Sequence, residues 1–380
     1  LLTKMVSFVT IILSIFTVSQ TVNAQNLQIS GGNNFSASLC SDGKVYAWGQ
    51  NGLGQLGRDA SNVKYTEARF ATPRLVYLPA GNTLTMKQVD AGSGNTGIAL
   101  ACDGTVWTWG GNCTNGNIGN GTTGGACNAG AVDGTDYYSS MQQVLKGGQT
   151  VGGTAFLNTI SYINASTRTS FAVETGTGKV LAWGNNADGD LGLGTSGNAG
   201  NTYTPSYVLT AAGTQLTGIV AVEGSDYGSY ALGSDGFVYS WGRNDPGNKD
   251  LGRTVAGDQA YAKRVRAYDH LLNNGTTTDL SNIVKMSGGD THGLAIDANG
   301  DLWSWGGDWG PGQRGWGATG NSPEYATRVV APGTPCAYQQ WKFGPWLTGV
   351  AEVSAGQQHS IALMKDGRVV TFGDNSSGQL

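Results

Sequence analysis

The sequence predicts an all-β protein, a β-propeller of four-stranded antiparallel blades, from three observations. A short motif, G-x-[VL]-x-x-[WF]-G, occurs six times with unchanged internal spacing. Its aromatic positions are separated by 61, 74, 58, 64 and 67 residues, a period typical of a propeller blade or a solenoid coil. Glycine accounts for 62 of 380 residues, and charged residues make up only 13%. This composition favours many short strands joined by turns over helices.

The first 24 residues have the features of a signal peptide, so we expect the propeller over residues 25–380. Lys4 supplies a positive start, residues 6–18 form an apolar run, and small residues precede a cleavage site after Ala24. The apolar run is short for a membrane span, and no later segment resembles one. We therefore expect a mature chain without a membrane span, either secreted or held at the cell surface.

Each copy of the motif predicts a β-hairpin whose second strand carries an aromatic ring. An Asp-Gly pair, or a close variant, supplies the positive φ angles of a tight turn. In the strand that follows, Val45 and Ala47 point to one side, and Tyr46 and Trp48 to the other. The glycine after each ring allows a bulge or a close backbone approach. The ring positions are predicted to form the core of the repeat: Trp48, Trp109, Trp183, Trp241, Trp305 and Phe372.

Each complete unit contains four strand-like runs. The first run ends at the Asp-Gly turn, the second carries the ring, the third contains a valine such as Val76, and the fourth contains an aliphatic residue such as Val89. Four antiparallel strands make one blade of a propeller. We therefore expect one blade per unit, with about six repeats present.

The repeats resemble the regulator of chromosome condensation repeat family over about residues 29–380. Residues 36–57 match its pattern well, and the closest copy is residues 354–380, which match at Gly356, His359, Ser360, Ala362, Leu363, Asp366, Gly367, Phe372, Gly373, Asn375, Gly378, Gln379 and Leu380. The family histidine is otherwise present only at His292, and the second unit has Asn117-Ile118-Gly119 in place of Gln-Leu-Gly. With the signal peptide, the resemblance implies a bacterial, exported propeller, usually of seven blades. Because the sixth unit stops at Leu380, one residue short of its motif glycine, we expect this propeller to be incomplete at the C-terminus.

The charge of the chain argues against a nucleic-acid partner. The formal net charge is -4, whereas a nucleic-acid-binding surface needs a basic stripe. The one basic cluster, Lys263, Arg264 and Arg266, is better interpreted as a solvated strand edge.

We find no candidate catalytic, cofactor-binding or metal-binding residue in the sequence. It has no nucleophile elbow, phosphate-binding glycine loop or metal-ligand spacing. Asn186, Asp188 and Asp190 hint at a calcium loop, but no glutamate follows at the required distance. The lack of carboxylates and histidines at equivalent loop tips counts against an enzyme, and no cofactor is expected.

The connectors between strands are the candidate binding sites, because loops on a rigid scaffold usually carry function. Two aromatic clusters outside the repeat positions resemble binding hot spots, one on each face: Trp309 and Trp316, and Tyr338, Trp341, Phe343 and Trp346. The alternative is that these rings only cover the apolar edge of their own blade.

The five cysteines suggest one disulfide in an exported protein. Cys113 and Cys127 lie in one long loop and are the expected pair. Cys40 and Cys102 are expected to be small buried hydrophobic residues.

Three functions compete. The leading hypothesis is an exported, non-enzymatic scaffold that binds a protein or glycan through its loop faces, with adhesion as one role. The second is a secreted inhibitor of an extracellular enzyme such as a β-lactamase, because a secreted bacterial relative of this fold acts in that way. The third and weakest is a lyase or hydrolase with a central active site. The eukaryotic namesake of the family is a nuclear exchange factor, and the export signal and acidic balance argue against transferring that role.

Overall fold

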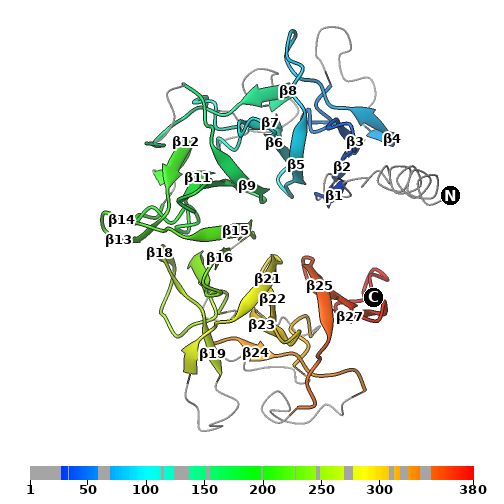
Figure 1. Cartoon of the computed structure of the whole chain (residues 1–380), viewed down its shortest axis with the longest axis vertical. Helices are drawn as coiled ribbons and strands as arrows, with labels where there is room; N and C mark the ends of the chain where they lie inside the picture. The colour runs from blue at the N-terminus through cyan, green and yellow to red at the C-terminus, as the bar shows by residue number, and fades with distance from the viewer. Residues whose placement is uncertain are drawn as a thin grey trace, which may run out of the picture.

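Successive antiparallel sheets surround a central axis, which confirms the predicted propeller (Figure 1). The computed structural model describes residues 27–380 except 33, 59–68, 113–114, 124–136, 151–154, 198–199, 227, 245–248, 269–276, 308–311, 317–323 and 334–343. In this described part of the chain, five blades have four strands and the last has three. None of its helices is long and apolar enough to cross a bilayer.

The strands of each blade follow one another in chain order from the axis to the rim. The first three blades contain β1 (Gln28–Gly31), β2 (Phe35–Leu39), β3 (Val45–Gln50) and β4 (Arg69–Leu75); β5 (Met86–Ala91), β6 (Thr96–Ala101), β7 (Val106–Gly111) and β8 (Tyr137–Gln143); β9 (Ile160–Ala165), β10 (Thr169–Glu174), β11 (Val180–Gly184) and β12 (Thr202–Tyr207). The last three contain β15 (Ile219–Gly224), β16 (Gly228–Gly233), β17 (Val238–Gly242) and β18 (Gln259–Arg264); β21 (Ile283–Gly288), β22 (His292–Asp297), β23 (Leu302–Gly306) and β24 (Thr327–Arg328); β25 (Val350–Ala355), β26 (His359–Met364) and β27 (Val369–Gly373). Two short hairpins lie in connectors: β13 (Leu209–Ala211) with β14 (Thr214–Gln215), and β19 (Arg266–Tyr268) with β20 (Thr277–Asp279).

The blade boundaries differ from the predicted repeat units by one strand. The fourth run of each unit was expected to complete its own blade, but β5 pairs with β6 of the next blade. The preceding strand, β4, is the outer strand of its blade and pairs with β3. The chain therefore leaves each blade at the rim and enters the next one at the axis. Each sequence unit thus supplies the inner strand of the blade that follows it.

The glycine after the ring forms a bulge in the first four blades, one of the two roles predicted for it. Gly49 and Gly184 have φ angles of 114° and 116°, and the strand register shifts at both positions. A Cβ atom at Gly49 would lie 2.6 Å from the carbonyl oxygen of Asn34, so a larger residue would collide with backbone.

The ring of each blade from the second to the sixth packs against a loop of the preceding blade. The predicted core rings Trp48 and Phe372, in the first and the last blade, are only half-buried. The side chains of Trp109, Trp183, Trp241 and Trp305 are fully buried. Trp109 Nε1 donates a hydrogen bond of 2.9 Å to the carbonyl of Gln55, which lies in the Gln-Leu-Gly segment of the first blade. Trp183 makes the same bond to Asn117 over 2.8 Å, and Trp241 makes it to Asp190 over 2.9 Å. The first four blades are therefore joined by a buried indole and a buried hydrogen bond, whereas Trp305 Nε1 of the fifth blade is buried without a hydrogen-bond partner among the described residues.

The last glycine of the Gln-Leu-Gly segment is needed for this contact. Gly57 has a φ of 58°, and a Cβ atom there would lie 2.3 Å from Val76 and 3.0 Å from Trp109. The second unit keeps the same geometry with a different sequence, because a Cβ atom at Gly119 would lie 2.7 Å from Trp183 Nε1.

A second link joins neighbouring blades on the opposite face. The Asp-Gly turn of one blade offers a carbonyl to the first residue of the next inner strand, as in Met86 N to Gly43 O at 2.9 Å. The same bond recurs from Ile160 to Gly104 at 3.2 Å and from Ile283 to Gly236 at 3.0 Å. The turns that define the motif therefore also position the inner strands.

The free cysteines do not lie where we expected. Cys102 is exposed and Cys40 is partly exposed, so the prediction that both are buried is wrong. Both follow the last buried position of a strand, at the start of an Asp-Gly turn. Cys113 and Cys127 lie outside the described residues.

Substitution of Trp183 should separate the two parts of the contact between blades. Trp183→Ala should lower the free energy of unfolding by about 3–5 kcal/mol, because it leaves a large cavity. Trp183→Phe loses the indole hydrogen bond and should lower the free energy of unfolding by only about 1 kcal/mol, apart from a small contribution from the reduced side-chain volume. The loss is small because Ser170 Oγ still donates to the Asn117 carbonyl. Urea unfolding followed by tryptophan fluorescence measures both values. An equal loss for the two variants would contradict this account of the contact.

Candidate functional site

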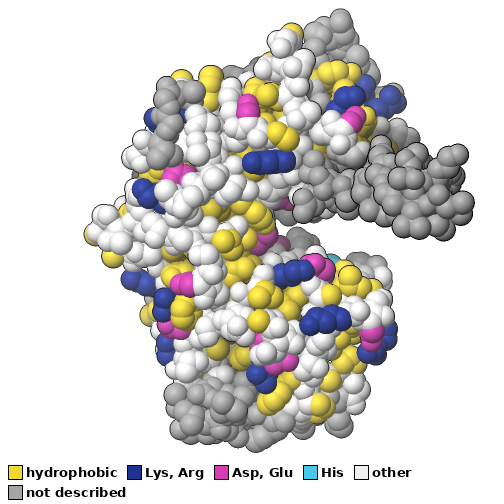
Figure 2. All heavy atoms as spheres, in the orientation of Figure 1, with side chains coloured by type: hydrophobic (Ala, Val, Ile, Leu, Met, Phe, Trp, Pro, Cys, Tyr) yellow, Lys and Arg dark blue, Asp and Glu magenta, His cyan; other side chains and the backbone are white. Residues whose placement is uncertain are grey.

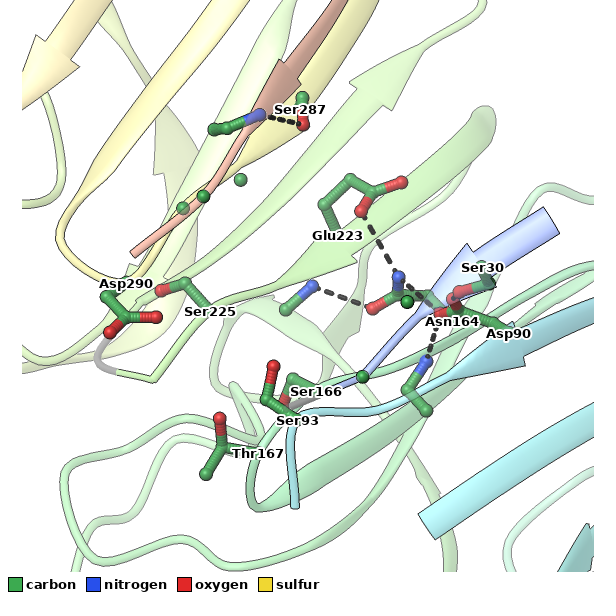
Figure 3. A pocket seen from close by; sticks show the side chains of 18 of the residues that line it. Ser30, Asp90, Ser93, Asn164, Ser166, Thr167, Glu223, Ser225, Ser287 and Asp290 are labelled. Atoms are coloured by element: carbon green, nitrogen blue, oxygen red, sulfur yellow. Dashed lines mark hydrogen bonds between the residues drawn. The ribbon is translucent and has the colours of Figure 1, made fainter. Parts of the chain in front are cut away.

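A polar cavity of about 460 Å³ opens where the six inner strands end (Figure 3). It is lined by the loops that lead from the inner to the second strand, and every blade contributes: residues 29–32, 90, 91, 93, 164–167, 223–226, 287–290 and 354–357. A second cavity of about 730 Å³ continues along the axis and shares Asp90, Asn164 and Glu223 with the first. These three side chains therefore lie between two cavities.

Small residues after each inner strand allow the loops to meet. A Cβ atom at Gly32 would lie 2.7 Å from the carbonyl oxygen of Gly92, and one at Gly92 would lie 2.6 Å from that of Ser166. One at Gly289 would lie 2.4 Å from that of Gly356. Larger side chains here would force the blades apart, so these glycines and small residues set the width of the cavity.

Asp90 ties three inner strands together. Its carboxylate accepts hydrogen bonds from Ser30 Oγ of the first blade at 2.5 Å, and from Asn164 Nδ2 and the Ala165 amide of the third at 3.0 and 2.8 Å. The amide of Ala91 donates a fourth bond at 3.0 Å. Burial raises the pKa of Asp90, and the bonds from Ala165, Ser30 and Ala91 oppose this change.

Glu223 extends the same network to the fourth blade. Its carboxylate accepts a bond from Tyr162 OH at 2.9 Å and another from Asn164 Nδ2 at 3.2 Å. Asn164 lies between Glu223 and Asp90 in Figure 3, and its Oδ1 accepts from the Gly224 amide at 2.8 Å. Burial, followed by the charge of Asp90, raises the pKa of Glu223 to about 8.

Two further carboxylates lie on the rim of the cavity, in the loops after β15 and β21. Asp226 and Asp290 both line it, and Asp290 lies beside Ser225 in Figure 3. Burial raises the pKa of both groups, to about 6 in Asp290, where the charge of Asp226 adds to the effect. The described lining residues thus include four carboxylates and no lysine, arginine or histidine.

The arrangement suits binding of a polar or cationic group. In the described part of the chain, no group of three or more histidine, cysteine, aspartate or glutamate side chains could hold a metal ion. In the segment that resembled a calcium loop, the Asn186 side chain stabilises the loop itself: it donates to Thr195 O and accepts from the Leu191 amide.

The structure places two of the predicted partner-binding rings, and the others lie outside the described residues. Trp316 is 3% exposed and packs with Tyr268 and Val330, as a ring that covers its own blade would do. Trp346 is half-buried, with the Arg328 guanidinium 4.7 Å from its ring. Trp309, Tyr338, Trp341 and Phe343 are not described, so a binding role for them stays a prediction.

The basic cluster is a paired strand edge. Arg264 and Arg266 both form ion pairs with Asp279, and Arg264 stacks 3.7 Å over Phe237. On the face shown in Figure 2, lysine and arginine side chains are scattered among acidic ones.

The sequence did not predict the carboxylates of the cavity. Functional carboxylates were expected at loop tips, whereas Asp90 and Glu223 lie at the ends of inner strands whose alternate residues, such as Val89 and Val222, are buried. The available signal was a polar residue followed by a small one at the same place in every unit: Ser30, Asp90, Asn164, Glu223, Ser287 and Ser354.

Comparison with known proteins identifies the repeats. One family model, described as the regulator of chromosome condensation (RCC1) repeat, matches residues 27–55, 283–308 and 350–379. A second model with the same description matches residues 42–99 and 177–232.

Curated relatives are similar over parts of longer proteins. The chain is 30% identical over 203 residues to the probable E3 ubiquitin-protein ligase HERC6 of Homo sapiens, which corresponds to 53% of this chain and 17% of that protein. It is 26% identical over 362 residues to Protein pim1 of Schizosaccharomyces pombe, or 91% of this chain and 58% of that protein.

Solved structures share the fold at low identity. Human WBSCR16 has a TM-score of 0.66 at 19% identity, covering 93% of this chain and 78% of that one. Yeast RCC1 (Prp20), solved bound to Kap60, has a TM-score of 0.63 at 20% identity, covering 93% of this chain and 71% of that one. Prp20p of Saccharomyces cerevisiae, studied with its binding to Gsp1p and histones, has a TM-score of 0.59 at 21% identity, covering 92% and 69%.

Glu223 should make the stability of the fold depend on pH. Between its ordinary pKa of 4.5 and its raised value of about 8, the folded state holds a proton that the unfolded state has lost. The contribution of Glu223 to the free energy of unfolding therefore falls as pH rises through this window. Glu223→Gln should flatten the pH dependence in urea titrations, whereas Asp103→Asn, in an exposed turn, should not. An unchanged slope in Glu223→Gln would contradict the raised pKa.

Proposed function

This chain is built from regulator of chromosome condensation repeats, and on that premise we propose that it is a non-enzymatic scaffold that binds a protein partner on the face where the central cavity opens. The single observation that carries the proposal is the cavity, lined by all six blades and by four carboxylates without a basic residue among the described lining. Because the raised pKa leaves Glu223 protonated near neutral pH, the negative potential of the cavity comes from the other carboxylates. A potential of one sign at a concave site attracts a partner of the opposite sign and orients it.

The rigidity of the surroundings supports a binding role. The loops at the cavity are held by backbone close approaches and by hydrogen bonds between blades, such as Asp90 to Ala165 and Asn164 to Gly224. A preorganised site loses little conformational entropy when it binds. Yeast RCC1 (Prp20), which shares this fold, was solved in complex with another protein, although its partner cannot be transferred to this chain at 20% identity.

Catalysis is less well supported by the same residues. Carboxylates with raised pKa values can mark an active site, but structural networks produce the same shifts. Asp90 accepts four hydrogen bonds and Glu223 two from this chain, so both carboxylates are engaged in joining blades. We therefore favour binding over a lyase or hydrolase.

We further propose that the scaffold is exported and acts in adhesion, or as an inhibitor of an extracellular enzyme. It rests on Lys4, the apolar run at residues 6–18 and the small residues before Gln25. One soluble enzyme recovered as the partner would favour inhibition, and binding to whole cells or to glycans would favour adhesion.

N-terminal sequencing of the protein purified from the medium or the cell surface tests the export proposal. We expect the mature chain to begin at Gln25, because signal peptidase cleaves after small residues such as Ala24. A chain that retains residues 1–24 and stays inside the cell would overturn this part of the proposal.

Photo-crosslinking tests which face binds. A benzoylphenylalanine at position 93 or 357, on the cavity rim, should crosslink to the partner in the native host. The same probe at position 103 or 366, in exposed turns of the opposite face, is the matched control and should give little product. Crosslinks confined to positions 103 and 366 would show that the partner binds the other face.

A further inference from the structure

Each of the last four junctions between successive blades contains a buried leucine, three residues before the inner strand begins. Its amide donates a hydrogen bond of 2.8–2.9 Å to the carbonyl of the valine that follows the preceding outer strand. Its side chain, at most 4% exposed, packs in the core cluster that contains the same valine. These junction leucines and their valines are Leu157 with Val144, Leu216 with Val208, Leu280 with Val265, and Leu347 with Val329.

The junction between the first and second blades has no such leucine. Thr83 stands three residues before β5 and is exposed, whereas Leu84, one position later, is only half-buried. Val76 follows the outer strand β4 here, and none of the described residues donates a hydrogen bond to its carbonyl. The residue before the inner strand has a positive φ in the other four junctions, whereas Thr85 does not. This junction therefore lacks both parts of the contact.

A cavity of about 370 Å³ lies where the junction leucine is missing. Its volume is within the range of sites that bind small groups, about 300–1,000 Å³. The carbonyl-bearing residue Val76 lines it, together with apolar side chains of both blades: Leu78, Leu84, Met86 and Met141. Methionine side chains adapt to the shape of an incoming group. The cavity therefore combines apolar walls with a backbone acceptor that the described chain leaves unused.

The cavity is open to a ligand, because exposed residues form part of its lining: Asp42, Lys44, Tyr77, Asn82 and Thr83. The charges at this rim compensate each other, since Lys44 Nζ lies 3.2 Å from the Asp42 carboxylate. Tyr77 is 44% exposed, and tyrosine is frequent in binding hot spots. The site thus favours an uncharged, largely apolar group.

We propose that this cavity binds an extended peptide segment of a partner protein, which inserts a leucine or similar aliphatic side chain and donates its backbone N–H to the Val76 carbonyl. The other four junctions carry the argument, because there the chain itself supplies this combination to the equivalent valine. In such recognition, main-chain hydrogen bonds provide affinity and a side-chain pocket provides specificity. The site lies beside an Asp-Gly turn, on the face opposite the central cavity, so it is independent of the function proposed there.

Methionine methyl NMR on the full chain tests the inference, because two of the five methionines, Met86 and Met141, line the cavity. The probe is the acetylated and amidated peptide Gly-Thr-Gln-Leu-Thr-Gly, which has the sequence of residues 213–218 and contains one junction leucine. We expect this peptide to shift both methyl signals in a saturable way. Met286 and Met364, in β21 and β26, are outside the cavity lining and are the internal controls.

Two altered peptides separate the parts of the contact. Serine in place of the leucine should weaken binding about tenfold or more, because it removes the aliphatic side chain that would be buried. N-methylation of the leucine amide should weaken binding about fivefold, because it removes the donor to the Val76 carbonyl.

Two variants of the chain test the location. Insertion of one glycine between Thr85 and Met86 gives Leu84 the spacing of the junction leucines, so it should fill the cavity, abolish peptide binding and raise the thermal midpoint. Thr83→Trp should obstruct the rim and also abolish binding. Thr217→Trp is the matched control, since this exposed threonine follows a junction leucine that is already in place, and it should leave binding unchanged.

Saturable shifts confined to Met86 and Met141, and lost on glycine insertion, would support the inference. No shift at millimolar peptide, equal binding of the serine peptide, or unchanged binding after glycine insertion would each overturn it. Shifts of the same two signals that depend on protein concentration without peptide would assign the cavity to a second copy of the chain, and would also overturn it. Crosslinking at positions 93 and 357 tests the central cavity separately, so either proposal can fail without the other.

Discussion

The architecture depends on the contact between the indole of one blade and the glycine-containing loop of the blade before it. The contact combines a large buried apolar area with a buried N–H to carbonyl hydrogen bond, as in Trp183 to Asn117. Because it forms only between successive units, it converts a repeated sequence into a circular order of sheets. The second link, from each Asp-Gly turn to the next inner strand, fixes the opposite face of the same interface.

The contact also explains why glycines recur at fixed positions around the ring. The glycine at position 57 has to lie against both Val76 and Trp109, and the small residue at Gly97 lies under the ring, where a Cβ atom would be 2.3 Å from Trp109. Where the loop sequence changes, as at Asn117-Ile118-Gly119, the backbone carbonyl and the glycine are kept. The interface depends on backbone groups, so the side chain of the first loop residue is free to vary.

The central site is a consequence of bringing six inner strands to one axis. Polar residues at the ends of these strands would be solvated in an isolated sheet, but around the axis they face one another. Asp90, Asn164 and Glu223 form hydrogen bonds across blade boundaries, which stabilise the ring. Burial at the axis raises the pKa values of Asp90 and Glu223. Asp226 and Asp290 lie in the loops that follow two of these strands and line the same cavity.

The sequence by itself determined the all-β class, the number of repeats, the hairpin turns, the bulge glycines and the ring positions. These features are local: turn chemistry, alternation and spacing are encoded within some sixty residues of each other. The tertiary structure alone decided to which blade the inner strand belongs, because β5 can pair on either side and packing at the axis selects β6. It also decided that Asp90 and Glu223, 133 positions apart, share one asparagine, and that Asp226 and Asp290 line the same cavity. Their juxtaposition follows from the angle between successive blades, which no single repeat encodes.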